Sequence, residues 1–260
     1  MIGKGLFVTP EKKTKAKLRL FCFPYAGGSA SIYFPWIKKL NNNVELIAIQ
    51  PPGRGSRMEE RPHDFMKDLV NEIMLYADLI SQKPYILFGH SLGSRMAFEL
   101  AINMQLSAKP LPELFIASGS KAPHLPNIRP PIYNLPTADF NNELEKLNGT
   151  PKELLSNKEL MLFFEPLLRA DFKIAETHQS KAIRLPIPIK VLYGQNDSYI
   201  SVEMLNAWKN LSEFDVEITD IPGGHFFINE QSDLVLQKVN MFINSLQMNP
   251  RPNALEAGFI

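Results

Sequence analysis

The sequence lacks most of the features that mark secreted, membrane-spanning or metal-binding proteins. Cys22 is its only cysteine, so neither an intrachain disulfide nor a cluster of thiolate metal ligands can form. No apolar run approaches the roughly 18 residues that span a bilayer, and no signal-like apolar core follows the amino-terminal lysines. We therefore expect a cytoplasmic protein without a membrane partner. Cys22 lies in an apolar run, where we expect a buried structural thiol rather than a nucleophile.

An excess of charge of one sign and the common cofactor motifs are also missing. The 28 Lys and Arg residues and 27 Asp and Glu residues leave a formal net charge of +1. This balance gives no reason to expect nucleic acid as the main partner. The sequence contains no H-E-x-x-H motif, no spaced Cys/His set and no phosphate-binding glycine loop. We therefore predict neither a metal nor a nucleotide cofactor.

What the sequence does contain is an alternation of strand-like and helical segments. Strands are predicted at residues 18–23, 44–50, 85–88, 114–118, 187–193 and 215–221. Helices are predicted at residues 32–40, 64–80, 202–211 and 232–246, and another follows the third strand. This alternation indicates parallel βαβ units in a mostly parallel central sheet flanked by helices. Before it, residues 1–17 read as a loose lead-in that touches the fold through Leu6 and Phe7.

The alternation is interrupted between residues 121 and 185. Prolines are dense up to residue 136, and helices are predicted at 138–147, 151–155 and 157–178, the last kinked or divided at Pro166. An insertion of this kind belongs above the carboxyl ends of the strands, as a lid. The sequence thus predicts a single α/β domain over residues 1–260, with a core at about 18–120 and 186–246 and a helical lid at about 121–185.

The stretch from Tyr85 to Glu99 places a serine between a strand and a helix. It contains Gly89-His90-Ser91-Leu92-Gly93, a G-x-S-x-G elbow in which the serine occupies a strained turn and the glycines leave room for neighbouring backbone. The Leu92 N–H would then lie at the start of the following helix, where an anionic oxygen is favoured. The pentapeptide alone fits an ordinary turn equally well, because glycine and serine are common turn residues.

Two later loops supply the base and the carboxylate that a serine nucleophile needs. Asp197 follows the strand at 187–193, and His225 follows the strand at 215–221. The order Ser91, Asp197, His225 is that of α/β hydrolases and differs from the other serine-triad orders. The sequence therefore predicts a catalytic triad of these three residues.

The loop after the first strand is the expected source of a second oxyanion donor. It reads Pro24-Tyr25-Ala26-Gly27-Gly28, and the Ala26 N–H is the best candidate, although a plain glycine-rich turn also fits. Gly89, His90 and Gly93 are predicted to support the elbow. The remaining histidines are expected to be solvated or locally hydrogen bonded, namely His63, His124 and His178.

Taken together, the motifs resemble those of the type II thioesterases, which are stand-alone α/β hydrolases of polyketide and nonribosomal peptide synthesis. The resemblance covers about residues 18–246 and rests on FPYAGG at 23–28, PPGR at 51–54, GHSLG at 89–93, PLLRADF at 166–172, GQND at 194–197 and GGHFF at 223–227. By position, Ser91, Asp197 and His225 match the family's triad, and Ala26 and Leu92 match its oxyanion donors. Family members often carry Met at the position of Leu92, a change of little expected effect where the backbone N–H acts.

The resemblance implies hydrolysis of acyl groups stalled on the phosphopantetheine arm of an acyl or peptidyl carrier protein, without a cofactor. We expect the enzyme to be a monomer. Two alternatives stay open. A general carboxylesterase or lipase shares the fold and triad, but the His-Gly pair common in its oxyanion loop is missing here. A non-catalytic binding protein of the same fold would normally have lost a triad member, and all three are present.

A cluster of basic residues suggests where the carrier docks. Carriers of this family are acidic, and Arg54, Arg57, Arg61 and Lys67 follow a predicted loop at the strand ends. A solvated charge cluster with no docking role is an equally good interpretation. The tail at 249–260 receives no role from the sequence, and neither does any acyl preference.

Overall fold

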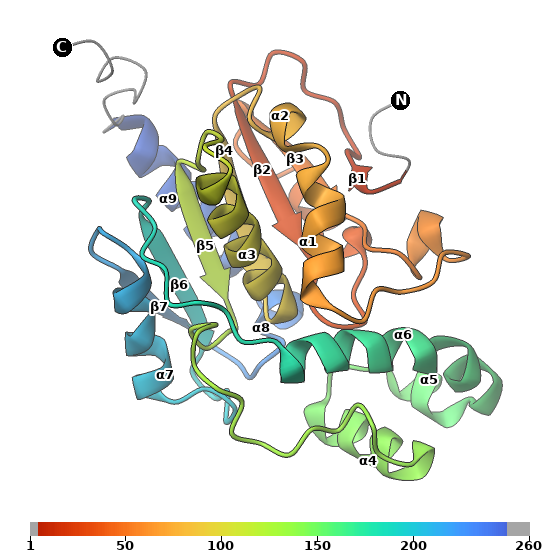
Figure 1. The fold of residues 1–260 in the computed structure, drawn as a ribbon. Helices are drawn as coiled ribbons and strands as arrows, with labels where there is room; N and C mark the ends of the chain where they lie inside the picture. The colour runs from red at the N-terminus through yellow and green to blue at the C-terminus, as the bar shows by residue number, and fades with distance from the viewer. Residues whose placement is uncertain (1–4, 249–260) are drawn as a thin grey trace.

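The structure, a computed structural model, describes residues 5–248 and contains a seven-stranded sheet (Figure 1). The strand order is β1-β3-β2-β4-β5-β6-β7, and β1 alone is antiparallel to its neighbour. The strands are β1 (Phe7–Val8), β2 (Leu18–Phe23), β3 (Val44–Ile49), β4 (Tyr85–His90), β5 (Leu114–Ser118), β6 (Ile189–Gly194) and β7 (Glu217–Ile221). The predicted mostly parallel sheet is confirmed. Among residues 5–248, no helix is long and apolar enough to cross a membrane.

The central strands read as continuous apolar runs because both of their faces are buried. Every residue of β3, β4 and β5 is buried, as expected for parallel strands covered by helices on both sides. Cys22 lies fully buried in β2, and burial raises the pKa of its thiol well above the ordinary value, in agreement with the predicted structural role.

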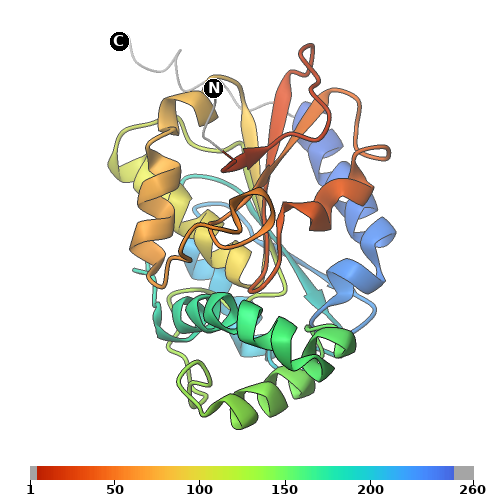
Figure 2. The ribbon, with the colours of Figure 1, turned by 90° about the vertical axis from the view of Figure 1, so that its right-hand side faces the viewer.

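Helices cover both faces of the sheet (Figure 2). Each face has its own cluster of buried apolar side chains. One face packs against α1 (Met66–Met74), α2 (Ala77–Ile80) and α3 (Leu92–Leu106), with Trp208 from η3 (Ala207–Leu211), which follows α7 (Val202–Asn206). The other face packs against η1 (Ala30–Trp36), α8 (Phe227–Glu230) and α9 (Ser232–Met248). The sheet is thus the middle layer of three.

Three predicted helices differ in detail from the structure. The helix expected at 64–80 is broken at Leu75 and Tyr76 into α1 and α2, and the one expected at 32–40 is the 3-10 helix η1, which contains Pro35. The segment at 202–211 divides into α7 and η3. These pieces are short because packing against the sheet, rather than intrinsic propensity, fixes their lengths.

Two short elements escaped the sequence analysis. Residues 7–8 form β1 and pair with Ile49 and Ala48 of β3, and Leu6 is buried, so the lead-in is attached to the sheet rather than loose. The helix α8 begins two residues after His225. Neither is long enough to show a hydrophobic period. The predicted tail at 249–260 lies outside the described residues.

The helices of the insertion at 121–185 lie across the carboxyl ends of the strands (Figure 1). They are α4 (Thr137–Leu147), α5 (Lys152–Ser156) and α6 (Lys158–Thr177), and Phe140, Leu144, Met161 and Leu168 form a small core between them. Of the two expectations for Pro166, a kink or a division of the last helix, the division is wrong, because α6 is continuous. Burial of Leu167 and Leu168 beside Pro166 offsets the cost of a proline inside a helix, which is about 3 kcal/mol.

Candidate active site

The elbow holds Ser91 in a conformation that L residues seldom adopt. Ser91 has φ 54° and ψ −115° between β4 and α3, and its N–H donates to the Ser118 carbonyl at 2.8 Å. Glycine is required on both sides, because a Cβ at Gly89 would lie 2.2 Å from the Gly93 carbonyl oxygen, and one at Gly93 would lie 2.1 Å from the Phe23 carbonyl oxygen. The serine side chain therefore stands at the tip of a close-packed turn.

A Gly93→Ala substitution should reduce the free energy of unfolding by about 1–3 kcal/mol or more, because the added methyl meets backbone that cannot yield. Chemical denaturation followed by circular dichroism measures this loss. The matched control is Gly224→Ala, since a Cβ at Gly224 meets nothing within 4 Å. Equal unfolding midpoints for the two variants would contradict the close approach at the elbow.

The structure brings Ser91, His225 and Asp197 into one hydrogen-bonded line. His225 Nε2 lies 3.0 Å from Ser91 Oγ, and His225 Nδ1 lies 2.7 Å from Asp197 Oδ2. Because a carboxylate only accepts, Nδ1 carries the proton and Nε2 is free to accept from the serine hydroxyl. Asp197 comes from the loop after β6 and His225 from the loop after β7, as the sequence predicted. The three predicted residues are thus close enough for His225 to accept the Ser91 proton while Asp197 binds the other ring nitrogen.

Asp197 is oriented by its own loop. Its side chain is fully buried, and its second oxygen, Oδ1, accepts from the Tyr199 N–H at 2.9 Å. With both oxygens engaged, the carboxylate cannot rotate away from the imidazole. Such a partner fixes the histidine tautomer and stabilises the imidazolium that forms when the serine gives up its proton.

His90 connects the elbow to the loop that carries His225. Its ring is buried, with Nε2 2.9 Å from the His225 carbonyl oxygen and Nδ1 2.9 Å from Ser118 Oγ. A carbonyl only accepts, so Nε2 carries the proton and Nδ1 accepts from the Ser118 hydroxyl. Burial, followed by repulsion from His225, lowers the pKa of His90 well below its ordinary value. A neutral His90 that holds the His225 backbone fits the supporting role predicted for it.

The two expected oxyanion donors have no competing acceptor. Among residues 5–248, neither the Ala26 N–H nor the Leu92 N–H donates a hydrogen bond to a protein group. Leu92 is the first residue of α3, where the helix dipole favours negative charge. The loop that contains Ala26 is closed by a bond from the Gly28 N–H to the Tyr25 carbonyl at 2.9 Å. These features agree with the oxyanion assignment, which stays a prediction.

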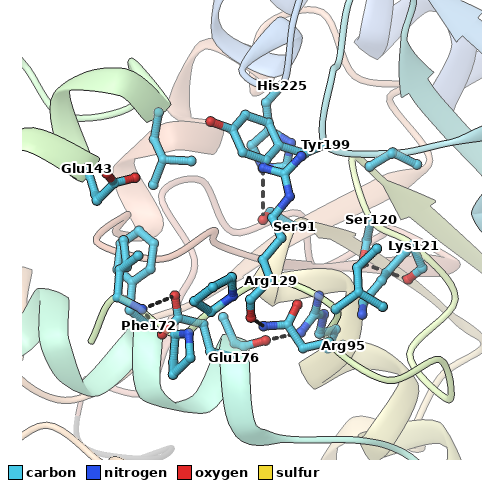
Figure 3. Close-up of a pocket in the computed structure, with 18 of the residues that line it drawn as sticks. Ser91, Arg95, Ser120, Lys121, Arg129, Glu143, Phe172, Glu176, Tyr199 and His225 are labelled. Carbon is cyan, nitrogen blue, oxygen red and sulfur yellow. Dashed lines mark hydrogen bonds between the residues drawn. The ribbon is translucent and has the colours of Figure 1, made fainter. Parts of the chain in front are cut away.

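A cavity of about 470 Å³ opens beside Ser91 and His225 (Figure 3). Its walls come from the strand-end loops and from the insertion, and they combine apolar and charged side chains. The apolar members include Ile132, Leu135, Leu147, Phe172, Ile200 and Met204. The cavity is large enough for an acyl chain next to the serine.

Several charged groups in this cavity were missed by the sequence analysis. Arg95 lies one helical turn after Ser91, and burial lowers its pKa to about 10. Burial, and then repulsion from Arg95, lowers the pKa of Lys121 to about 8. Burial raises the pKa of Glu176, which accepts from the Ile132 and Tyr133 N–H groups at 3.0 Å. The spacing of four residues between Ser91 and Arg95 was the one signal available in the sequence.

The basic cluster proposed for docking is only partly on the surface. Arg54 is 4% exposed and paired with Asp171, and Arg57 is 5% exposed and paired with Glu60 and Glu72. Neither a docking role nor a solvated charge is therefore correct for these two arginines, which were misjudged because their partners are distant in sequence. Arg61 and Lys67 are exposed, so docking at these two stays a hypothesis.

The other histidines lie away from the cavity. His63 Nε2 is 3.3 Å from Glu72 Oε2, and His178 Nε2 is 2.9 Å from Glu99 Oε1, so both are locally hydrogen bonded as expected. His124 differs, because its Nδ1 is buried without a hydrogen-bond partner in the part of the chain that the structure describes. None of the three lines the cavity beside Ser91.

Comparison with known proteins identifies the family. A family model for the thioesterase domain matches residues 18–243. The gramicidin S biosynthesis protein GrsT of Aneurinibacillus migulanus is 34% identical over 225 residues, covering 86% of this chain and 88% of that protein. ClbQ from the colibactin NRPS/PKS pathway is similar in structure, with a TM-score of 0.83 and 32% identity over 90% of this chain and 99% of that one.

A second solved structure is the type II thioesterase BorB from the borrelidin biosynthetic cluster. It has a TM-score of 0.81 and 29% identity, and it covers 90% of this chain and 95% of its own. The sheet and its flanking helices are therefore those of the predicted α/β-hydrolase fold. The chain belongs to the thioesterase family, in which it is a type II thioesterase that hydrolyses acyl thioesters.

Proposed function

We propose that the protein releases acyl groups from the phosphopantetheine arm of acyl or peptidyl carrier proteins and so clears stalled polyketide or nonribosomal peptide synthases. The observation that carries this proposal is the hydrogen-bonded line of Ser91, His225 and Asp197, which opens on a cavity of about 470 Å³. The relatives from gramicidin S biosynthesis, the colibactin NRPS/PKS pathway and the borrelidin biosynthetic cluster support a carrier-bound substrate.

Catalysis begins with transfer of the acyl group to the enzyme. His225 Nε2 takes the proton of Ser91 Oγ as the oxygen attacks the thioester carbonyl carbon. The N–H groups of Ala26 and Leu92 then hold the negative oxygen of the tetrahedral intermediate. Collapse of that intermediate breaks the carbon–sulfur bond, the imidazolium protonates the departing thiolate, and an acyl-serine ester remains.

Hydrolysis of the acyl-serine ester completes the cycle. A water molecule takes the place of the thiol, His225 removes its proton, and the resulting hydroxide attacks the ester carbonyl. The same two N–H groups hold the second oxyanion. When the intermediate collapses, His225 returns the proton to Ser91 Oγ and the carboxylic acid leaves. Asp197 keeps Nδ1 protonated throughout, so that Nε2 is the nitrogen that exchanges protons.

Turnover of matched substrates tests the substrate class. We expect higher kcat/KM for an acyl thioester than for the oxygen ester of the same acyl group, and a lower KM for carrier-bound than for free acyl-pantetheine. Mass spectrometry of the carrier and of the released acid follows the turnover of each substrate, with Ser91→Ala as the blank. Faster hydrolysis of the oxygen ester would favour the carboxylesterase alternative. Equal KM values for carrier-bound and free acyl-pantetheine would contradict a carrier partner.

The same assay addresses docking of the carrier. Arg61 and Lys67 are exposed. If they contact an acidic carrier, KM for the carrier-bound substrate should rise with salt concentration and when the charges of these two residues are reversed, while KM for free acyl-pantetheine stays constant. Insensitivity to both changes would place docking elsewhere.

We also propose that residues 1–260 act as one domain, with the helical insertion as its lid, in a cytoplasmic monomer. Light scattering of the purified chain tests the monomer.

A further inference from the structure

One carboxylate of the insertion reaches the loop that contains Ala26. Asp171, on α6, is 1% exposed, and its Oδ2 accepts from the Gly27 N–H at 2.7 Å. The same carboxylate accepts from Arg54, with Nη1 2.7 Å from Oδ2 and Nη2 2.8 Å from Oδ1. Asp171 thus links a helix of the insertion, the loop after β2 and the loop after β3.

Arg54 holds the same loop from its other side. Its Nη1 donates to the Gly28 carbonyl at 3.2 Å, and its Nε donates to the Pro52 carbonyl at 3.3 Å. The Gly27 N–H and the Gly28 carbonyl are therefore both bound by the ion pair. Gly27 has φ +76°, and a Cβ there would lie 2.7 Å from a Leu168 methyl group, so α6 is packed directly on this loop.

A buried ion pair is a costly way to attach a helix. Removing two charges from water carries a large desolvation cost, and apolar residues of similar volume often give equal or better stability. Apolar contact alone could therefore hold α6 in place. What it could not supply is a pair of directed hydrogen bonds to the backbone next to Ala26, because the bidentate fork fixes both position and angle.

We propose that Asp171 and Arg54 are positioning residues for the oxyanion loop, so that the insertion contributes to the chemistry as well as covering the cavity. The inference rests on the proposed function, since it takes the Ala26 N–H as an oxyanion donor. The bond to Gly27 fixes the peptide group on the carboxyl side of Ala26. Loss of this restraint lets the donor move away from the point where the oxyanion forms.

The chain contains a matched control on the same helix. Lys173 Nζ lies 2.6 Å from Asp64 Oδ2, two residues further along α6, and the Lys173 ammonium lies 4.1 Å from the centre of the Phe65 ring. This pair also joins the insertion to the body, but it makes no hydrogen bond to residues 24–28. Asp64→Asn therefore removes the charge of this anchor and weakens it, without changing the restraint on the oxyanion loop.

The test compares Asp171→Asn, Asp171→Leu and the double variant Arg54→Met/Asp171→Leu with Asp64→Asn. We expect kcat to fall by about 10- to 100-fold in the two Asp171→Leu chains, since small displacements of catalytic groups have effects of this size. Asp171→Asn keeps one oxygen acceptor, so its kcat should lie between that of the two Asp171→Leu chains and that of wild type. KM should change by no more than about twofold in all variants, and kcat of Asp64→Asn should stay near wild type.

Thermal unfolding separates positioning from simple stabilisation. Asp171→Leu alone leaves a buried, unpaired guanidinium and should lower Tm, whereas the double variant removes both charges and should recover most of it. If kcat recovers together with Tm, the pair is only structural and the proposal is wrong. If kcat stays low in a stable double variant, the proposal holds. A kcat loss in Asp64→Asn equal to that in Asp171→Leu would also overturn it.

An alkylboronic acid supplies the direct readout. It forms a tetrahedral adduct on a catalytic serine and places an oxygen in the oxyanion hole, so its affinity should fall by the same factor as kcat. An unchanged affinity in the double variant would contradict positioning of the oxyanion loop. Labelling with a fluorophosphonate keeps the two hypotheses apart. If wild type is not labelled at Ser91, the proposed function fails; if Ser91 is labelled and the variants behave as wild type, only this inference fails.

Discussion

Replacing Ser91 by alanine is expected to lower kcat for acyl-pantetheine hydrolysis by about 10⁴- to 10⁶-fold. The substitution removes the nucleophile but leaves the cavity, the N–H groups of Ala26 and Leu92 and the His225–Asp197 pair in place. The residual rate then reflects binding and oxyanion stabilisation alone. Release of free pantetheine thiol, followed with a thiol reagent in single-turnover and steady-state experiments, measures the change.

A matched control for this substitution is Ser94→Ala. Ser94 lies one turn further along α3, where its hydroxyl donates to the Gly89 carbonyl at 2.6 Å and accepts from the Ser118 N–H at 3.0 Å. Its loss should reduce stability, whereas the nucleophile stays in place. A Ser91→Ala enzyme that forms an acyl adduct, or one that turns over at the wild-type rate, would show that Ser91 is not the nucleophile.

Asp197→Asn should lower kcat by about 10⁴-fold, because the amide favours the wrong tautomer of His225. An asparagine NH₂ group facing Nδ1 donates a hydrogen bond, so the ring proton moves to Nε2, which can then no longer accept from Ser91 Oγ. The loss should appear in kcat and kcat/KM alike, since the interaction acts in the transition state. Stopped-flow measurement of the acylation step isolates the affected proton transfer.

Asp220→Asn is the control for this second substitution. Asp220 lies on β7 and is exposed, where its Oδ2 accepts from Gln195 Nε2 at 2.6 Å. It carries the same charge as Asp197 and lies near the same loops, but it does not contact His225. Asp197 does not act by fixing the His225 tautomer if Asp197→Asn keeps more than about a tenth of the wild-type kcat, or if kcat falls by the same factor in both variants.

The hydrogen-bonded line of Ser91, His225 and Asp197 could be anticipated from the sequence because each member depends on local signals. Ser91 lies in a recognisable strand–turn–helix, and Asp197 and His225 each follow a strand of clear apolar character. Parallel strands bring their carboxyl ends to one edge of the sheet, so residues that are remote in sequence converge without any need to predict their contacts. The fold and the hydrogen-bonded line of Ser91, His225 and Asp197 both follow from the alternation of strands and helices in the sequence.

The surroundings of that line depend on pairings that no local pattern encodes. Arg54 reads as a surface charge until its partner Asp171 is placed, 117 residues later in the chain. Arg95 and Glu176 become part of the cavity only when α6 lies across the strand ends. The continuous course of α6 through Pro166 has the same origin, because tertiary packing overrides the tendency of proline to interrupt a helix.

The site of Ser91 is completed very late in the chain. The residue proposed as its base, His225, lies 134 residues downstream in the loop that follows the last strand of the sheet. Contacts over such distances form only after the intervening strands have docked, and a nascent chain emerges from its amino end. While it is being synthesised, the polypeptide should therefore carry Ser91 without its proposed base, and we expect it to be inert toward thioesters. Hydrolytic activity should then report completed folding, and a chain truncated before β7 should be folded in part but without thioesterase activity.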